Sequence, residues 1–364
     1  MVTTPNVDTL YSLAFVDLGN GPATLVLPAT GKRYFSLHLM DMYTNTFAVL
    51  GTRTIGDHGG VFTVVGPRDS EPDGAIRSPT PWIWALARVL VDGPGDLDAV
   101  HKIQDAIRLK ASPARDVSVF AGRDAEWREY FSSASRLLME NPPPATDSAV
   151  LHRIAPLGLG RSFDVGKFST TEQSEIEAGI VDAKAILARD DPKQASNGWL
   201  YPEADLGDFG QDYVYRARTA IGTLAALPCQ EAMYMRAIAP DGSSKLRKDA
   251  LRLTFAADQI PPVDAFWSLT MYRATHGGQF YLADNPIHRY AIGDRTKGLR
   301  RNADGSLDIW IARHDPGAGK TENWLPAPAR GPYALYLRAY LPKASLLNGA
   351  YRLPPLVPVN SPRA

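Results

Sequence analysis

The sequence predicts a mainly β protein in which two β-sandwich or jelly-roll-like domains are separated by an α-helical region. Three observations predict this: one phrase of residues occurs twice, hydrophobic alternation of period two dominates both ends, and period 3.6 dominates the middle. We place the amino-terminal β-sandwich domain at residues 1–95, the helical region at 96–228 and the carboxy-terminal jelly-roll-like domain at 229–364.

The repeated phrase is Gly-x-Arg-Thr-x-Gly, found at residues 51–56 and again at 293–298. Each copy follows a strand pattern with two aromatic residues, Ser and Leu in succession, at 34–37 and at 266–269. Each copy also precedes a glycine turn and an alternating run, as the hairpin of one recurring unit would. The two β domains are therefore expected to be related.

The arginines of the two phrases, Arg53 and Arg295, are expected to occupy equivalent positions. A shared position needs a shared kind of partner, and a guanidinium binds a carboxylate through two parallel hydrogen bonds. We expect buried ion pairs, most simply with Asp41 or Asp294, rather than contacts with a substrate acid.

The first domain shows short alternating runs separated by Gly, Pro and Asn turns. A longer aromatic and β-branched run at 82–91 is interpreted as a further strand, although a buried helix has a similar composition. The other predicted strands of this domain are 25–27, 34–40, 46–50 and 61–65.

The middle of the chain carries apolar residues at helical spacing behind capping signals. Asp96 and Asp147 are candidate N-caps, and Ser169 with Glu172 forms a capping box. Three consecutive prolines at 142–144 end one helical run. The predicted helical runs begin near 97, 127, 147, 170 and 212.

After Pro228 the alternation returns to period two, with Asp-Gly turns at 241–242 and 304–305. A proline-rich tail at 353–358 is expected to be extended. The predicted strands are 231–238, 251–255, 265–272, 307–311 and 333–340.

The composition excludes several classes of protein. Lys and Arg total 39 and so do Asp and Glu, so no charge excess attracts nucleic acid. The one cysteine, Cys229, cannot form an intrachain disulfide. The longest apolar stretch is short and interrupted by Arg88, so no membrane span is expected. No secretory signal precedes Thr3, and we expect either a true start here or a missing upstream segment.

Two sets of motifs carry a resemblance to known families. Residues 4–12 (Thr-Pro-Asn-Val-Asp-Thr-Leu-Tyr-Ser), 41–47 (Asp-Met-Tyr-Thr-Asn-Thr-Phe) and 51–53 make the first half similar to domain of unknown function 1254. Residues 261–269, 285–290 and 323–328 make the second half resemble its usual companion, domain of unknown function 1214.

The resemblance implies a β-sandwich, a helical insert and a jelly-roll-like domain. Members of this family usually carry a further amino-terminal stretch, often with an export signal, which implies the periplasm or cell envelope and leaves the compartment of this chain unassigned. The family supplies no reaction, substrate or catalytic residue, so chemistry is argued from the residues.

His38 is the leading candidate for catalysis. Strand alternation places Tyr34, Ser36 and His38 on one polar face, where a histidine serves as a general base or metal ligand. Asp8 and Tyr11, which open the domain, are its expected catalytic partners. The alternatives are a half-buried histidine without a chemical role and local turn hydrogen bonds for Asp8.

Substrate-binding residues are expected in two places. Tyr43 and Asn45 follow the His38 strand. A second group lies in loops of the last domain, where binding residues concentrate, and its aromatic member could stack on a sugar or simply close a core edge. The second group is Asn285, His288, Arg289, Asn323 and Trp324.

Two classes of function follow. One is a hydrolase-type enzyme with a polar cleft between the β domains; the other is a carbohydrate-, lipid- or protein-binding envelope or scaffold protein without catalysis. The sequence holds no Gly-x-Ser-x-Gly, His-Glu-x-x-His, phosphate-loop or Cys-x-x-Cys motif, so no cofactor is predicted. A divalent metal, a small-molecule or carbohydrate ligand and a homo-oligomer are all compatible with the sequence.

Overall fold

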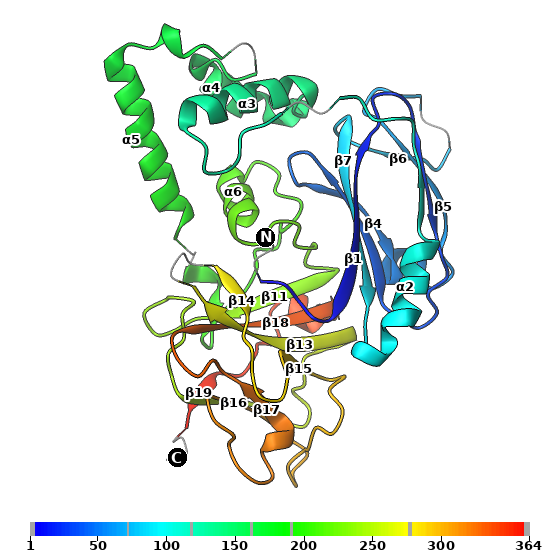
Figure 1. Ribbon diagram of the computed structural model, residues 1–364, viewed down its shortest axis with the longest axis vertical. Helices are drawn as coiled ribbons and strands as arrows, with labels where there is room; N and C mark the ends of the chain where they lie inside the picture. Colours follow the sequence, from blue (N-terminus) through cyan, green and yellow to red (C-terminus); the bar gives the residue numbers. More distant parts are fainter. Residues whose placement is uncertain are drawn as a thin grey trace.

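The computed structural model describes residues 4–70, 73–116, 119–160, 163–189, 192–275 and 279–359. The protein is mainly β, with two β domains and a group of helices above the junction between them (Figure 1). No helix in these ranges is long and apolar enough to cross a membrane.

The first β domain consists of two packed sheets. One has the strand order β1-β7-β3-β4 and the other β6-β5-β2-β8, and apolar side chains of both fill the space between them. The bounds are β1 Thr9–Asp17, β2 Ala23–Leu27, β3 Phe35–Asp41, β4 Thr46–Gly51, β5 Gly60–Val65, β6 Ile76–Arg77, β7 Trp82–Leu90 and β8 Arg108–Lys110.

The second β domain has a sheet of order β14-β13-β18-β11-β10-β9, with β15 also paired to β13, over a sheet of order β17-β16-β12-β19. The core lies between these sheets. The bounds are β9 Ala195–Ser196, β10 Trp199–Leu200, β11 Ala232–Ala237, β12 Ala250–Phe255, β13 Val263–Ala274, β14 Phe280–Leu282, β15 Ala291–Gly293, β16 Leu307–Ala312, β17 Trp324–Pro326, β18 Tyr333–Pro342 and β19 Leu356–Pro358.

Helices occupy most of the interval between the domains; α3, α4, α5 and α6 gather in the upper left of Figure 1, whereas α2 lies against the first β domain. The helices are α1 Thr52–Ile55, α2 Leu97–Ala106, α3 Trp127–Glu140, α4 Ser148–Ile154, α5 Thr170–Leu187, α6 Tyr213–Gly222 and α7 Ala344–Leu347. Shorter 3₁₀ turns are η1 Pro94–Asp96, η2 Ala145–Asp147, η3 Ala155–Leu157, η4 Val165–Lys167, η5 Pro192–Gln194 and η6 Thr321–Asn323.

The helical interval is not purely helical. β8 pairs with β2 of the first domain, β9 and β10 extend a sheet of the second, and Val100 of α2 packs into the first core. The capping box predicted at Ser169 and Glu172 is present. Asp96 precedes α2 as predicted, but its carboxylate binds Arg33 instead of capping the helix.

The predicted internal relationship is confirmed by the strand pairing. The β1-β7-β3-β4 order of the first domain matches β11-β18-β13-β15 of the second. Gly51 pairs with Ser36 and Gly293 pairs with Ser268, and each glycine N–H donates to the threonine three residues later. Arg53 and Arg295 therefore occupy equivalent positions.

Candidate functional site at the interface between the β domains

Each repeated arginine forms an ion pair with the other domain. Arg53 Nε lies 2.7 Å from Glu231 Oε2, and Arg295 Nη2 lies 2.9 Å from Asp8 Oδ1. Asp8 immediately precedes β1 and Glu231 immediately precedes β11, the matching strand. The two ion pairs are related by the same approximate twofold symmetry as the sheets.

The prediction that these arginines form ion pairs with Asp41 or Asp294 is wrong. The Asp41 carboxylate accepts hydrogen bonds from the backbone of Tyr43 and from Asn45, within its own turn. Asp294 accepts from the backbone N–H of Trp267. The Asp41 carboxylate is occupied within its own turn and the Asp294 carboxylate by the neighbouring strand β13, and the arginines bind acids of the other domain.

A polar row crosses the same position of each sheet. On β1, β7 and β3 the register aligns a tyrosine, an arginine and a serine, and on β11, β18 and β13 it aligns the same three residue types. We call these two rows the Ser-Arg-Tyr rows. They consist of Ser36, Arg88 and Tyr11 in the first domain and Ser268, Arg338 and Tyr234 in the second.

The arginines of the two rows are buried, with Arg88 5% and Arg338 4% exposed. Arg88 Nη2 donates to the Ala225 carbonyl at 2.6 Å, and Arg338 Nη2 donates to the Thr4 carbonyl at 2.9 Å. Ala225 lies in the segment before β11 of the second domain, and Thr4 lies in the segment before β1 of the first domain. Each arginine therefore crosses to the segment that leads into the opposite domain.

Neither row arginine forms an ion pair with a carboxylate among the described residues. Arg338 satisfies its other terminal nitrogen by donating from Nη1 to Thr270 Oγ1 at 3.0 Å. Arg88 Nη1 is buried and has no hydrogen-bond partner within the ranges the structure covers. Buried arginines are normally paired, so Arg88 carries an unusual unmet donor.

Tyrosines surround the row arginines without neutralising them. Burial raises the pKa of Tyr234, although the nearby Arg88 charge opposes this rise. Burial also raises the pKa of Tyr340 well above its ordinary value. Both phenols are therefore neutral at physiological pH, and the positive charge of the interface is not cancelled by them.

Tyr11 connects this interface to solvent, because it is 41% exposed. The guanidinium carbon of Arg88 lies 5.5 Å from the centroid of the Tyr11 ring. The Tyr11 hydroxyl accepts a hydrogen bond from Asn6 Nδ2.

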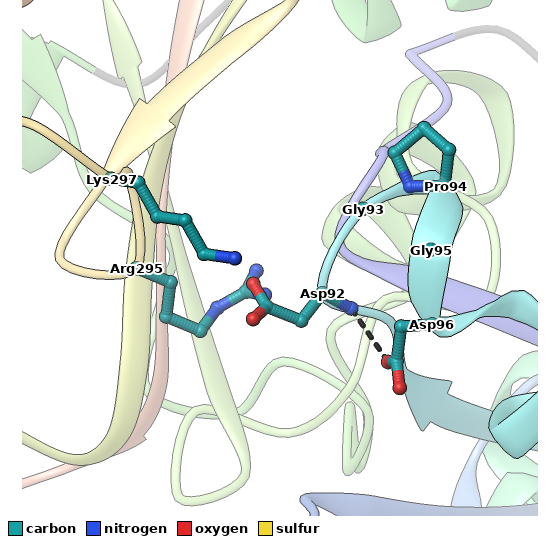
Figure 2. A pocket seen from close by; sticks show the side chains of 7 residues that line it. All are labelled: Asp92, Gly93, Pro94, Gly95, Asp96, Arg295 and Lys297. Atoms are coloured by element: carbon teal, nitrogen blue, oxygen red, sulfur yellow. Dashed lines mark hydrogen bonds and ion pairs between the residues drawn. The ribbon is translucent and has the colours of Figure 1, made fainter.

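An open crevice of about 630 Å³ lies at another edge of the domain interface (Figure 2). Asp92 faces Arg295 and Lys297 across it, and Asp96 accepts from the Asp92 backbone N–H. A smaller crevice of about 210 Å³ continues from it along Asp8 and the second Gly-x-Arg-Thr phrase. Two carboxylates and two cations line the larger crevice, so its charge is balanced. The row arginines carry the stronger signal of a missing partner.

The prediction that His38 lies on an accessible polar face of the sheet is wrong. His38 is completely buried, and its Nε2 lies 2.7 Å from Thr46 Oγ1. Burial lowers the pKa of His38 well below its usual value, and the Arg88 charge adds to this effect. His38 is buried because two distant segments cover this face of the sheet. The Gly207 carbonyl accepts from the Thr46 N–H, and the Ala225 carbonyl accepts from Arg88.

The other residues expected near His38 have different partners. Asp8 accepts from Ser268 Oγ at 2.5 Å and from Arg295, and Tyr11 belongs to the polar row. The Tyr43 hydroxyl donates to the Asn141 carbonyl, and Asn45 binds Asp41. Among described residues, no hydrogen bond joins His38 to Asp8, Tyr11, Tyr43 or Asn45. Their roles in catalysis or binding stay predictions.

The loop residues predicted to bind substrate in the last domain instead form hydrogen bonds within that domain. Arg289 Nη1 donates to the carbonyls of Thr321, Glu322 and Trp324, and its backbone N–H donates to Asn285. Trp324 is buried and donates to the Ala312 carbonyl. These contacts favour the core-edge alternative for Trp324 over a stacking platform.

The two remaining members of this loop group have separate positions. Asn323 is buried and donates to the carbonyls of Arg300 and Asp308. His288 is exposed and adopts a positive φ of 51°. Binding by either residue stays a prediction. Within the described ranges no three His, Cys, Asp or Glu side chains converge as metal ligands would.

Sequence analysis missed the row arginines and Glu231. Arg88 attracted attention only because it interrupts an apolar run. The stronger signal is that an arginine occurs inside two long and largely buried apolar strands, in WIWALARVL and in YALYLRAYLP. Charged residues are rarely buried in a central strand without a specific partner.

Comparison with known proteins identifies two families of unknown function. The model of the protein family of unknown function DUF1254 matches residues 1–111, and that of DUF1214 matches residues 231–344. A search of curated proteins finds no match to the chain.

A solved structure with a high TM-score shares the fold of this chain. The crystal structure of the VPA0106 protein from Vibrio parahaemolyticus is similar with a TM-score of 0.72 and 21% identity, covering 98% of this chain and 90% of that one. A putative uncharacterized protein from Burkholderia cenocepacia has a TM-score of 0.45 and 14% identity, covering 94% of this chain and 75% of that one. The chain is thus a paired DUF1254–DUF1214 protein, with the DUF1254 region first and the DUF1214 region second.

Proposed function

We propose that this protein binds a small organic acid, whose carboxylate is held by Arg88 at the interface between the two β domains. The observation that carries the proposal is the buried Nη1 of Arg88, which has no hydrogen-bond partner within the described residues. Tyr11, whose ring lies beside the Arg88 guanidinium, is 41% exposed, so the site would lie close to the surface.

The energetic argument concerns the cost of an unpaired buried charge. Removing an ion from water costs several kcal/mol, and a buried donor without a partner costs a further 1–3 kcal/mol or so. A bound carboxylate offsets both costs, because it supplies a countercharge and an acceptor together. The nearby carboxylates form their ion pairs with other arginines, Glu231 with Arg53 and Asp8 with Arg295, and the Arg88 charge reaches Glu231 only at longer range.

The chemical class follows from the donors that face the interface. A carboxylate oxygen accepts a strong, charge-assisted hydrogen bond from a guanidinium, and Nη1 of Arg88 would supply it because Nη2 is already bound to the Ala225 carbonyl. The phenols of Tyr11 and Tyr234 both lie close enough to Arg88 to interact with its charge, and they add hydroxyl groups to the site. A monoanion suits the site better than phosphate, because the single guanidinium offers one unmet donor.

Binding is favoured over hydrolysis by the position of the one histidine proposed as a base. Burial keeps the His38 ring away from solvent, and the lowered pKa of His38 keeps the ring neutral. A general base must reach the proton that it abstracts, directly or through one water molecule. The binding alternative, with a small acid as ligand, therefore has the better physical support.

The test is isothermal titration calorimetry with benzoate and with hexanoate. Arg88→Met should abolish binding, and Arg88→Lys should weaken it at least tenfold because the ammonium lacks the planar fork. Exposed Arg153 on α4 provides the control Arg153→Met, which should bind normally. Equal binding by the wild type and a folded Arg88→Met variant, or no binding of either acid by the wild type, would reject the proposal.

A further inference from the structure

The face of the sheet that carries Arg88 continues into an apolar surface. The register aligns Leu86 of β7 with Leu13 of β1 in the next row, and Trp84 with Phe15 in the row after that. We call Leu13, Phe15 and Trp84 the apolar face. It begins directly beside the Tyr11–Arg88 pair.

The apolar face is exposed to an extent that is unusual for large side chains on a long strand. Leu13 is 61% and Phe15 59% exposed. Phe15 stacks on Trp84 with ring centroids 5.5 Å apart and planes inclined by 23°. The Trp84 indole N–H is buried and lacks a partner among the described residues. Contiguous exposed apolar surface on a monomer commonly marks a binding site.

Strand alternation alone does not require this exposure. The opposite face of β1 packs Leu10, Ala14 and Val16 into the core of the first domain, so the fold already uses one face of the strand. Polar residues at positions 13 and 15 would satisfy the same alternation. The apolar character of the outer face therefore needs a separate explanation.

We propose that the acid bound at Arg88 is amphipathic, with an alkyl tail that lies along Leu13 and Phe15. The inference rests on the proposed function and specifies the ligand class. Charge complementarity selects this occupant, because an unmet guanidinium donor stands in register at one end of the apolar face. Four strand residues separate Arg88 from Trp84, a span of about 14 Å that suits a medium-length fatty acid.

The experiment is a chain-length series of hexanoate, octanoate and decanoate, measured by calorimetry on the full chain. Each added methylene that becomes buried should tighten binding about fourfold. The double variant Leu13→Thr, Phe15→Thr should flatten the series, because it weakens decanoate binding far more than hexanoate binding. Val61, exposed on β5 of the opposite sheet, gives the control Val61→Thr, which should keep the full chain-length dependence.

The outcomes separate the two proposals. Binding of all three acids with equal affinity would overturn the amphipathic ligand and leave the carboxylate site standing. Equal binding of decanol and decanoate would overturn the role of Arg88 and with it both proposals. If the double variant changes the sedimentation coefficient of the ligand-free protein instead of the chain-length series, a second copy covers this face and the tail proposal fails.

Discussion

Arg53 and Glu231 lie 178 residues apart and in different β domains, yet Arg53 Nε and Glu231 Oε2 are 2.7 Å apart. The Glu231 carboxylate of this ion pair is fully buried. Arg53 itself is partly exposed, so solvent screens one side of the pair. The Tyr34 hydroxyl donates to the other oxygen of Glu231 at 2.9 Å. The pair thus joins the domains through a side chain that has no access to water.

Arg53→Met should lower the free energy of unfolding by about 2 kcal/mol, because it leaves the Glu231 carboxylate buried with one partner fewer. Adding Glu231→Gln should recover part of this loss, since the buried charge is then removed. Urea denaturation of the two single variants and the double variant gives the coupling free energy between Arg53 and Glu231. A loss no larger than that of Arg153→Met, an exposed site, would contradict the interdomain role.

Gly51→Ala and Gly293→Ala should both destabilise the protein strongly. A Cβ added at Gly51 would lie 2.2 Å from the Phe35 carbonyl oxygen, and one at Gly293 would lie 2.1 Å from that of Trp267. The backbone must move in each case, at a cost of about 2 kcal/mol or more.

Gly179 in α5 has open space around it, so Gly179→Ala should instead stabilise the protein by about 0.5–1 kcal/mol. Thermal melting distinguishes these directions.

His38→Ala should lower the melting temperature by several degrees. The ring is completely buried, so truncation leaves a cavity and removes the partner of Thr46 Oγ1. The exposed histidine of α2 provides the control His101→Ala, which should melt like the wild type. An unchanged melting temperature would mean that His38 does not stabilise the fold and would restore its catalytic candidacy.

Asp96 should contribute stability that disappears in acid. The bidentate hydrogen bond from Arg33 lowers the pKa of Asp96 to about 2. A depressed pKa in the folded state stabilises the protein above the unfolded pKa, near 3.8, and this contribution is lost as pH falls toward 2. Asp96→Asn should therefore reduce stability at pH 6 more than at pH 2.

The urea midpoint at pH 6, 4, 3 and 2 tests this dependence. The neighbouring Asp98 is exposed on α2, and Asp98→Asn should leave the difference between pH 6 and pH 2 unchanged. A constant difference between the wild type and Asp96→Asn across the whole range would show that the Arg33 interaction does not depend on the charge of Asp96.

Sequence periodicity predicted the mainly β class, the helical middle and the related β domains, because these depend on local alternation and on a repeated phrase. It placed Arg53 and Arg295 in equivalent positions but gave them the wrong acids. Alternation put His38 on the correct face of its strand and could not reveal that a distant segment near Ala225 contacts that face. Partners that are separated by more than a hundred residues leave no trace in local pattern.

The reciprocal crossing of charged side chains between the domains also has a consequence for synthesis. Asp8 and Arg88 emerge early from the ribosome, whereas their partners Arg295 and Ala225 follow 287 and 137 residues later. At roughly 5–20 residues per second, these side chains wait on the order of 10–50 s for their partners. The first domain is therefore translated with its future buried surface still open to water, and its native contacts are completed only when the last long strand arrives.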